Sequence, residues 1–310
     1  MIVGAVCMSH SPLMDRGGAD AAVENRFRSA VAQAASFAAA AKPDLTIVFH
    51  PDHLNGFFYG LLPAFCVGIA GRSVGDYGTG AGPLDIPAEV AGDCAAELLR
   101  LGIDTALSHR MTADHGAVQP LELLSAGHPP GPMLPVFINC AAPPLPGFPR
   151  VRALGAAIGA WAAARPERVL IVGSGGLSHD PPLPALATAP PELRARLVEG
   201  GDLTPDQREA RQERVYAEGE RMAAGSSDLL PPDPGWDRML LDAFQDGDLA
   251  VLDGTTDAAL AATGGRGGHE VRCWIAALAA LGPGYAAETL FYEPVDAWIT
   301  GMGVLTARPA

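Results

Sequence analysis

The stretch IVGAVCMSHSP, residues 2–12, is a short apolar run with β-branched residues that ends in Ser-His-Ser-Pro. A second stretch, LTIVFHPDH at residues 45–53, has the same arrangement, an apolar run followed by histidines. Each run is typical of a buried strand, and the polar residues after it are typical of a loop. Between the two runs, residues 20–41 carry apolar side chains at helical spacing, with Asp20 as the expected N-cap and Pro43 beyond the end. The first fifty residues therefore predict strand, helix and strand.

The same alternation continues along the chain. Helices are expected at residues 88–101 and 151–164, and short strands at 133–138 and 169–172. Strands that alternate with helices predict the α/β class, with a mostly parallel central sheet and helices on both faces. Glycines and a serine follow the last of these strands and lead to His179.

The second half of the chain is expected to belong to the same catalytic domain, which we take as residues 1–310. Residues 191–262 contain a charged helical stretch at 205–224 and a proline-rich break at 230–234, which predict a helical insertion. A helix is expected at 268–281, and the tail at 289–305 reads as two short strands around Pro294.

Composition excludes several kinds of partner. The net charge of −14 argues against nucleic acid and against an anionic membrane surface. No apolar stretch is long enough to span a bilayer, and no basic leader precedes the first strand. The cysteines are five in number, scattered and without a C-x-x-C pair, which favours a reducing cytoplasm over a disulfide framework or a structural zinc site.

Three histidines, His10, His53 and His179, follow predicted strands, where functional loops of doubly wound sheets gather. Glu270 follows a glycine-rich approach at residues 264–268, which would let the backbone come close to another element. Two imidazoles and a carboxylate on one face of an octahedral ion form the facial triad of non-heme Fe(II) oxygenases. We therefore expect His10, His53 and Glu270 to bind one metal.

Each of these residues also has a simpler explanation when it is taken alone. Glu270 in the first turn of a helix is a favourable charge near the helix N-terminus. His50 could ligate in place of His53, and Asp52 could orient an imidazole or be an exposed acid. His115 and His179 titrate near neutrality and suit proton transfer, although either could be structural.

Two other functions are disfavoured at Gly173-Ser174-Gly175-Gly176. The turn lacks the lysine and the spacing of a phosphate-binding loop. Ser174 is not in the G-x-S-x-G pattern of an α/β-hydrolase nucleophile.

Taken in order, several segments resemble the class III extradiol ring-cleaving dioxygenases, the LigB-like superfamily, and most of all its single-chain members that act on 2,3-dihydroxyphenylpropionate. The segments that carry the resemblance are MSHSP at 8–12, PDHLNGFFY at 51–59, DHG at 114–116, LPVFIN at 134–139, PLPGF at 144–148, GSGGLSH at 173–179, and HE at 269–270. Together they run from residue 1 to about residue 307.

The resemblance implies a LigB-like fold and Fe(II) held by His10, His53 and Glu270. It implies His179 as the base toward a catechol hydroxyl and His115 as the acid of the later ring-opening steps. The reaction would be extradiol cleavage of 3-(2,3-dihydroxyphenyl)propionate, and of 2,3-dihydroxycinnamate, by O2, giving a yellow 2-hydroxy-6-oxo-nonadienedioate in aromatic catabolism. Such enzymes are usually homo-oligomers.

The substrate carboxylate needs a cation, and we expect Arg266, near Glu270, to bind it, with Arg150 and Arg152 as further candidates. Three other functions stay open from the sequence. They are the same chemistry on another 3-substituted catechol, a metal-binding member without turnover, and a zinc hydrolase, because residue types alone do not fix the metal.

Overall fold

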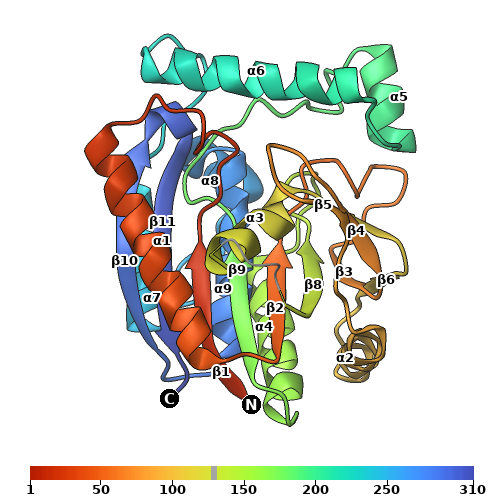
Figure 1. Cartoon of the computed structure of the whole chain (residues 1–310). Helices are drawn as coiled ribbons and strands as arrows, with labels where there is room; N and C mark the ends of the chain where they lie inside the picture. The colour runs from red at the N-terminus through yellow and green to blue at the C-terminus, as the bar shows by residue number, and fades with distance from the viewer. Residues whose placement is uncertain (127–130) are drawn as a thin grey trace.

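A computed structural model describes residues 1–126 and 131–310, and its centre is a twisted eight-stranded sheet (Figure 1). The strand order is β10-β11-β1-β9-β2-β8-β3-β6. The strands are β1 (Ile2–Met8), β2 (Leu45–His50), β3 (Phe65–Gly68), β6 (Ala106–Ser108), β8 (Met133–Ile138), β9 (Val169–Ser174), β10 (Ala286–Val295) and β11 (Thr300–Arg308).

The middle of this sheet is parallel, as predicted. Strands β1, β9, β2 and β8 lie side by side and run in one direction, so their carboxyl ends meet at one edge. The edges differ from a purely parallel sheet, because β11 pairs antiparallel with β1 and with β10, and β3 pairs antiparallel with β8. The predicted pair of strands in the tail is this β10–β11 hairpin, with longer strands than expected.

Helices cover both faces of the sheet. One face packs against α1 (Ala21–Ala41) and α3 (His115–Leu124), and the other against α4 (Phe148–Ala163), α9 (Val271–Ala280) and α2 (Ala88–Arg100). Asp20 caps α1 as predicted, because its carboxylate accepts hydrogen bonds from the backbone N–H groups of Ala22 and Val23. The α/β class and the helices on both faces are thus confirmed.

The segment predicted as a helical insertion contains four helices. They are α5 (Pro191–Glu199), α6 (Pro205–Ala223), α7 (Pro234–Asp246) and α8 (Asp257–Gly264). Helix α6 begins with a capping box between Thr204 and Gln207, and it crosses above the carboxyl ends of the central strands (Figure 1). That the segment is an insertion within one catalytic domain stays a prediction.

The sequence did not predict a small second sheet, which consists of β5 (Ala81–Pro83), β4 (Gly71–Val74) and β7 (Met111–Ala113). The single helix expected at 268–281 is two elements in the structure. Gly267–Glu270 form a short 3-10 helix, η1, and α9 begins only after it; a second such turn, η2, spans Asp296–Trp298. Among the described helices, none is long and apolar enough to cross a membrane.

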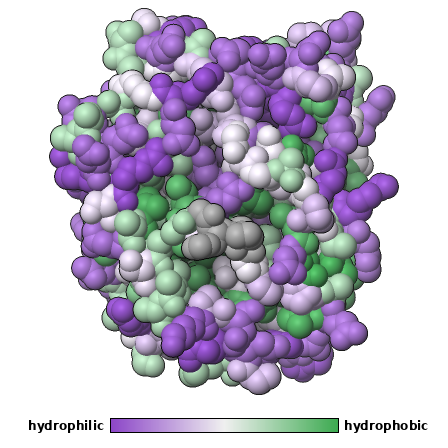
Figure 2. Space-filling view, in the orientation of Figure 1, coloured by the Kyte–Doolittle hydropathy of each residue, from purple (hydrophilic) through white to green (hydrophobic). Residues whose placement is uncertain are grey.

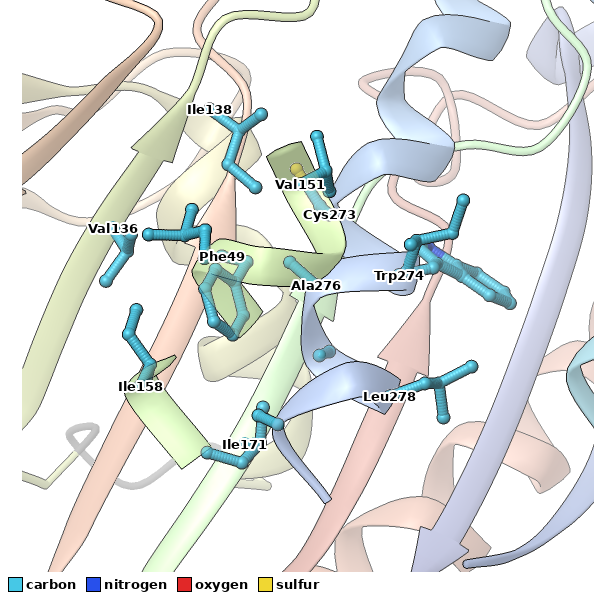
Figure 3. Close-up of a cluster of buried hydrophobic side chains, with 14 of the residues drawn as sticks. Phe49, Val136, Ile138, Val151, Ile158, Ile171, Cys273, Trp274, Ala276 and Leu278 are labelled. Atoms are coloured by element: carbon cyan, nitrogen blue, oxygen red, sulfur yellow. The ribbon is translucent and has the colours of Figure 1, made fainter. Parts of the chain in front are cut away.

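The core between the sheet and helices α4 and α9 is closely packed. Phe49, Val136 and Ile171 of the strands belong to one buried cluster with Ile158 of α4 and Trp274 of α9 (Figure 3). The two helices approach each other at glycines. A Cβ on Gly155 would lie 2.2 Å from the carbonyl oxygen of Ala276, and one on Gly159 would lie 2.1 Å from that of Ala280. Helix α9 therefore sits where it does because α4 has no side chain at these positions.

We expect Gly155→Ala to lower the free energy of unfolding by about 1–3 kcal/mol, because the added methyl group overpacks the α4–α9 contact. Gly92→Ala is the matched control, since a Cβ there, inside α2, meets nothing within 4 Å. It should raise stability by up to about 1 kcal/mol through helix propensity. Urea unfolding of both variants checks the pair, and equal effects of the two substitutions would contradict the close approach of α4 and α9.

Candidate metal centre and active site

Parallel strands deliver the site residues to one edge of the sheet. His10 follows β1, His53 follows β2 and His179 follows β9, and these three strands are neighbours. His115 is the first residue of α3, and Glu270 ends the turn η1. All five side chains are buried. The structure thus brings together the five residues that the sequence singled out as metal ligands and proton-transfer groups.

The Glu270 carboxylate is the centre of this cluster. Its Oε1 lies 3.1 Å from Nε2 of His53 and 3.5 Å from Nε2 of His179. Its Oε2 lies 3.8 Å from Nε2 of His10 and accepts a hydrogen bond from the backbone N–H of Gly176. Glu270 thus crosses the fold from the far end of the chain and presents its oxygens to three imidazole nitrogens.

The outer nitrogen of each expected ligand histidine is held by an acceptor. The Ser174 hydroxyl donates its proton to the carbonyl oxygen of Gly116 at 2.5 Å, so it can only accept from Nδ1 of His10, 3.0 Å away. Nδ1 of His53 lies 3.1 Å from Oδ2 of Asp114. Both imidazoles are therefore protonated at Nδ1 and direct Nε2 inward, which is the arrangement that orients metal-binding histidines.

The Nδ1 atoms of His179 and His115 also face hydrogen-bond acceptors. Nδ1 of His179 donates to the carbonyl oxygen of Leu177 at 2.9 Å. Nδ1 of His115 lies 2.7 Å from Oδ2 of Asp76, whose other oxygen accepts the backbone N–H of His115. Their Nε2 atoms are therefore left available to exchange protons at the cavity side.

Burial and charge set the protonation of the cluster. Burial lowers the pKa of His10 to about 3, so that imidazole is neutral. Burial also opposes a charge on His53, but the Asp114 and Glu270 carboxylates outweigh it and raise the His53 pKa well above its usual value. The neighbouring imidazoles, in turn, hold the pKa of Glu270 well below its usual range despite its burial. The centre is therefore built to attract positive charge.

A divalent cation fits this donor set. Neutral imidazole nitrogens and an ionised carboxylate are the ligands it requires, and it would take over the charge balance now provided by protonated imidazole. Ligand atoms of His10, His53 and His115 lie within 4.8 Å of one another. Either Glu270 or His115 could thus complete a set of three with His10 and His53.

His50 lies apart from this cluster. Its Nδ1 donates to the carbonyl oxygen of Pro51 at 2.8 Å, its ring packs near Phe137, and it does not line the cavity. Asp52 accepts backbone hydrogen bonds from Asn55, Gly56 and Phe57, so it shapes the loop while Asp114 holds the imidazole of His53. Of the two histidines left open by the sequence, the structure places His53 in the cluster.

The glycines before Glu270 permit a close approach to the loop after β9. A Cβ on Gly267 would lie 2.0 Å from Nε2 of His179, and one on Gly265 would lie 2.2 Å from its carbonyl oxygen. Gly265 also has a φ of 74°, which favours glycine. The backbone of this run therefore packs directly on His179 and carries Glu270 to the same place.

A cavity of about 630 Å³ opens on the cluster. His10, His53, His115 and His179 line its inner end, and its walls include apolar side chains such as Leu183, Trp298 and Ile299. This volume is in the range of pockets that enclose a small organic ligand.

Arg266 is not among the described residues that line the cavity. Its Nε donates to Asp180 at 2.6 Å, and its two other nitrogens donate to the carbonyl oxygens of Pro181 and Leu183. The guanidinium thus braces the 181–184 loop. Arg152 is paired with Asp253 on the outer side of α4, and Arg150 is exposed. The structure therefore does not bring these three arginines to the cluster.

Sequence reasoning missed the acceptors behind the imidazoles. Asp76, Asp114 and Ser174 come from three different segments, and only the position of Asp114 directly before His115 offered a signal. It also missed the arginines of α5 and α6 that line the cavity, because nothing in a helical charge pattern indicates which face is turned inward.

Comparison with known proteins gives the class as aromatic ring-opening dioxygenases. Residues 4–303 match the family described as "Catalytic LigB subunit of aromatic ring-opening dioxygenase". The chain belongs to this LigB family, as its sequence motifs predicted.

Curated relatives match over nearly the whole chain. A protein of Mycolicibacterium smegmatis is 46% identical over 100% of both chains, and one of Photorhabdus laumondii is 44% identical over 100% of this chain and 98% of its own. Both are named 2,3-dihydroxyphenylpropionate/2,3-dihydroxicinnamic acid 1,2-dioxygenase. A protein of Pseudomonas putida with the same name and the suffix 1 is 47% identical over 97% of each chain.

We expect Asp114→Asn to weaken binding of a divalent metal ion by about 10- to 100-fold, because it removes the charge that holds and polarises the His53 imidazole. Competition with a chromophoric chelator under anaerobic conditions measures the affinity, and the melting temperature shows that the variant is folded. Asp228→Asn is the control, since that carboxylate is exposed and, within the described residues, pairs with Arg221 alone. An affinity equal to that of the wild type in folded Asp114→Asn would contradict this role.

Proposed function

We propose that this dioxygenase uses Fe(II) to cleave the ring of 3-(2,3-dihydroxyphenyl)propionate, and of 2,3-dihydroxycinnamate, at the bond next to the two hydroxyls. The product from 3-(2,3-dihydroxyphenyl)propionate would be a 2-hydroxy-6-oxo-nonadienedioate, and the cinnamate would give the corresponding trienedioate. The observation that carries the proposal is the gathering of imidazole Nε2 atoms around the Glu270 carboxylate at the end of a cavity. The names of the full-length relatives support the substrate.

In this proposal His10, His53 and Glu270 hold the metal. When bound there, Fe(II) supplies coordination sites for both catechol oxygens and for dioxygen, and the electron transfer that lets them react. Ser174 and Asp114 keep the two imidazoles in the tautomer and direction that metal binding needs.

His179 would act as the base. Its Nδ1–H is committed to the carbonyl oxygen of Leu177, so the Nε2 lone pair is the group that can accept a proton from a catechol hydroxyl. The Glu270 carboxylate, 3.5 Å from that nitrogen, favours the protonated imidazole that results, and despite burial it raises the pKa of His179.

His115 would act as the acid. The Asp76 carboxylate accepts the hydrogen bond from its Nδ1–H and fixes the ring, so Nε2 is the atom that would pass a proton to the oxygen that leaves during ring opening. The Tyr77 ring packs edge-on against His115, with centroids 4.7 Å apart, and limits the water around it. The two histidines thus have different partners and suit opposite proton transfers.

The alternative of a zinc hydrolase has one observation in its favour. Three histidines, His10, His53 and His115, can approach one ion, and a three-histidine set with an open position is a known catalytic zinc arrangement. Metal dependence separates the two functions, since only the dioxygenase requires Fe(II) and O2.

We also propose a cytoplasmic location and assembly as a homo-oligomer. Free, buried cysteines at all five positions suit a reducing compartment.

Protein reconstituted anaerobically with Fe(II) should form a yellow product when 2,3-dihydroxyphenylpropionate is added in air, with one O2 consumed per substrate. His10→Ala should form none, because one Nε2 ligand is lost. Absorbance and oxygen-electrode traces measure both. Turnover that persists in His10→Ala, or that is supported by Zn²⁺ without O2, would overturn the proposal.

His179→Gln and His115→Gln should each lower kcat by about 10²- to 10⁴-fold, the usual contribution of a positioned acid or base. Fe(II) affinity should stay within a few-fold of the wild type, since neither side chain is a proposed ligand. His109→Gln, at an exposed position, is the control. A His115→Gln protein that loses its iron would instead identify His115 as a ligand.

A further inference from the structure

The cavity is lined by arginines from the two helices that cover it. Arg196 comes from α5, and α6 turns one face inward, with residues at helical spacing. The lining residues of that face are Gln207, Ala210, Arg211, Arg214 and Val215. The outer end of the cavity is therefore bounded by three guanidinium groups, while the imidazoles lie at its inner end.

The three arginines that line the cavity form a local excess of positive charge in an acidic protein. The chain has a net charge of −14, and the surface over α5 and α6 is largely hydrophilic (Figure 2). Against the three arginines, Glu192 is the one carboxylate among the described lining residues outside the histidine cluster. A cavity that concentrates arginine in this way favours an anionic ligand.

Arg211 is already engaged by the loop that carries His53. Its Nη1 donates to Oδ1 of Asn55 at 3.0 Å, and its Nη2 donates to the carbonyl oxygen of His53. Arg211 is therefore a positioning residue, which ties α6 to the backbone of a proposed metal ligand.

Arg196 and Arg214 retain donors. Arg196 donates from Nη2 to the carbonyl oxygen of Leu54 at 3.3 Å, and its Nε is buried with no hydrogen-bond partner in the described part of the chain. Burial and the nearby charge of Arg211 lower its pKa. Among the described residues, Arg214 makes no side-chain hydrogen bond or ion pair that would occupy its guanidinium. Buried donors without partners and uncompensated charge both favour a carboxylate.

We propose that Arg196 and Arg214 bind the side-chain carboxylate of the substrate and select 3-substituted catechols that carry an acid. The ring then lies toward the histidines and the acid toward α5 and α6. This assignment rests on the proposed function, and it replaces Arg266, whose guanidinium is occupied by the 181–184 loop.

The first test uses the wild-type protein with iron bound. Its kcat/KM for 2,3-dihydroxyphenylpropionate should exceed that for 3-propylcatechol, a neutral analogue of similar length, by at least about tenfold. Equal values would overturn the inference while leaving ring cleavage established. No cleavage of any catechol would contradict the proposed function instead.

The second test does not depend on turnover. Calorimetry of the metal-free protein should show tighter binding of 3-phenylpropionate than of 3-phenylpropanamide, since neither compound carries catechol hydroxyls. Arg196→Met/Arg214→Met should abolish this difference and should lower the acid-to-neutral kcat/KM ratio by about 10- to 100-fold.

Arg194→Met is the matched control, an exposed arginine of α5 that does not line the cavity, and it should keep the wild-type preference. Arg214→Met alone removes an exposed side chain, so it reports on the site even where the double variant is unstable. An unchanged acid preference in folded Arg214→Met and in the double variant would overturn the inference.

Discussion

The burial of the Glu270 carboxylate among imidazoles is the interaction on which the rest of the site depends. A carboxylate removed from water is costly unless opposite charge or hydrogen bonds compensate it. Here Nε2 atoms of His10, His53 and His179 face it, and the Gly176 N–H donates to it. The Nδ1–H of each imidazole donates to a nearby acceptor, which fixes the orientation of the ring. The Nε2 atom therefore points toward Glu270. A divalent cation could replace the protonated imidazole as the positive charge beside Glu270. In the proposed function, the metal ligands His10 and His53 and the base His179 would therefore share one carboxylate.

The fold serves this arrangement in two ways. The parallel strands β1, β9 and β2 end together and place three histidine-bearing loops next to one another. Glycines then remove the remaining steric obstacles, because Gly155 and Gly159 let α9 pack on α4, and Gly265 and Gly267 let the preceding turn pack on His179. Helices α5 and α6 lie above the carboxyl ends of these strands (Figure 1). Their arginines line the cavity. The sheet thus places the histidines, while helices α5 and α6 supply part of the lining of the cavity in front of them.

The strands that precede His10 and His53 and the helix capped by Asp20 were predictable, because apolar runs and caps are local signals. The convergence of His10, His53 and Glu270 was predictable only in outline, since a parallel sheet brings loops to one edge without fixing distances. The roles of Asp76, Asp114 and Ser174 were not predictable. Each accepts a hydrogen bond from an imidazole that belongs to a segment distant in the sequence. The role expected for Arg266 rested on its nearness in sequence to Glu270, which does not fix the direction of a side chain. In the structure its guanidinium donates to Asp180 instead of lining the cavity. Which arginine faces a ligand depends on how α5 and α6 lie over the sheet.

We propose that Glu270, and not His115, completes the metal site with His10 and His53. An anaerobic crystal structure of the Fe(II)-loaded protein, with anomalous diffraction at the iron edge, tests it directly. We expect one iron bound by Nε2 of His10, Nε2 of His53 and a carboxylate oxygen of Glu270, with His115 bonded to Asp76 and outside the coordination sphere. Iron bound by His115, or bound between Asp76 and Asp114 with Glu270 uncoordinated, would contradict it.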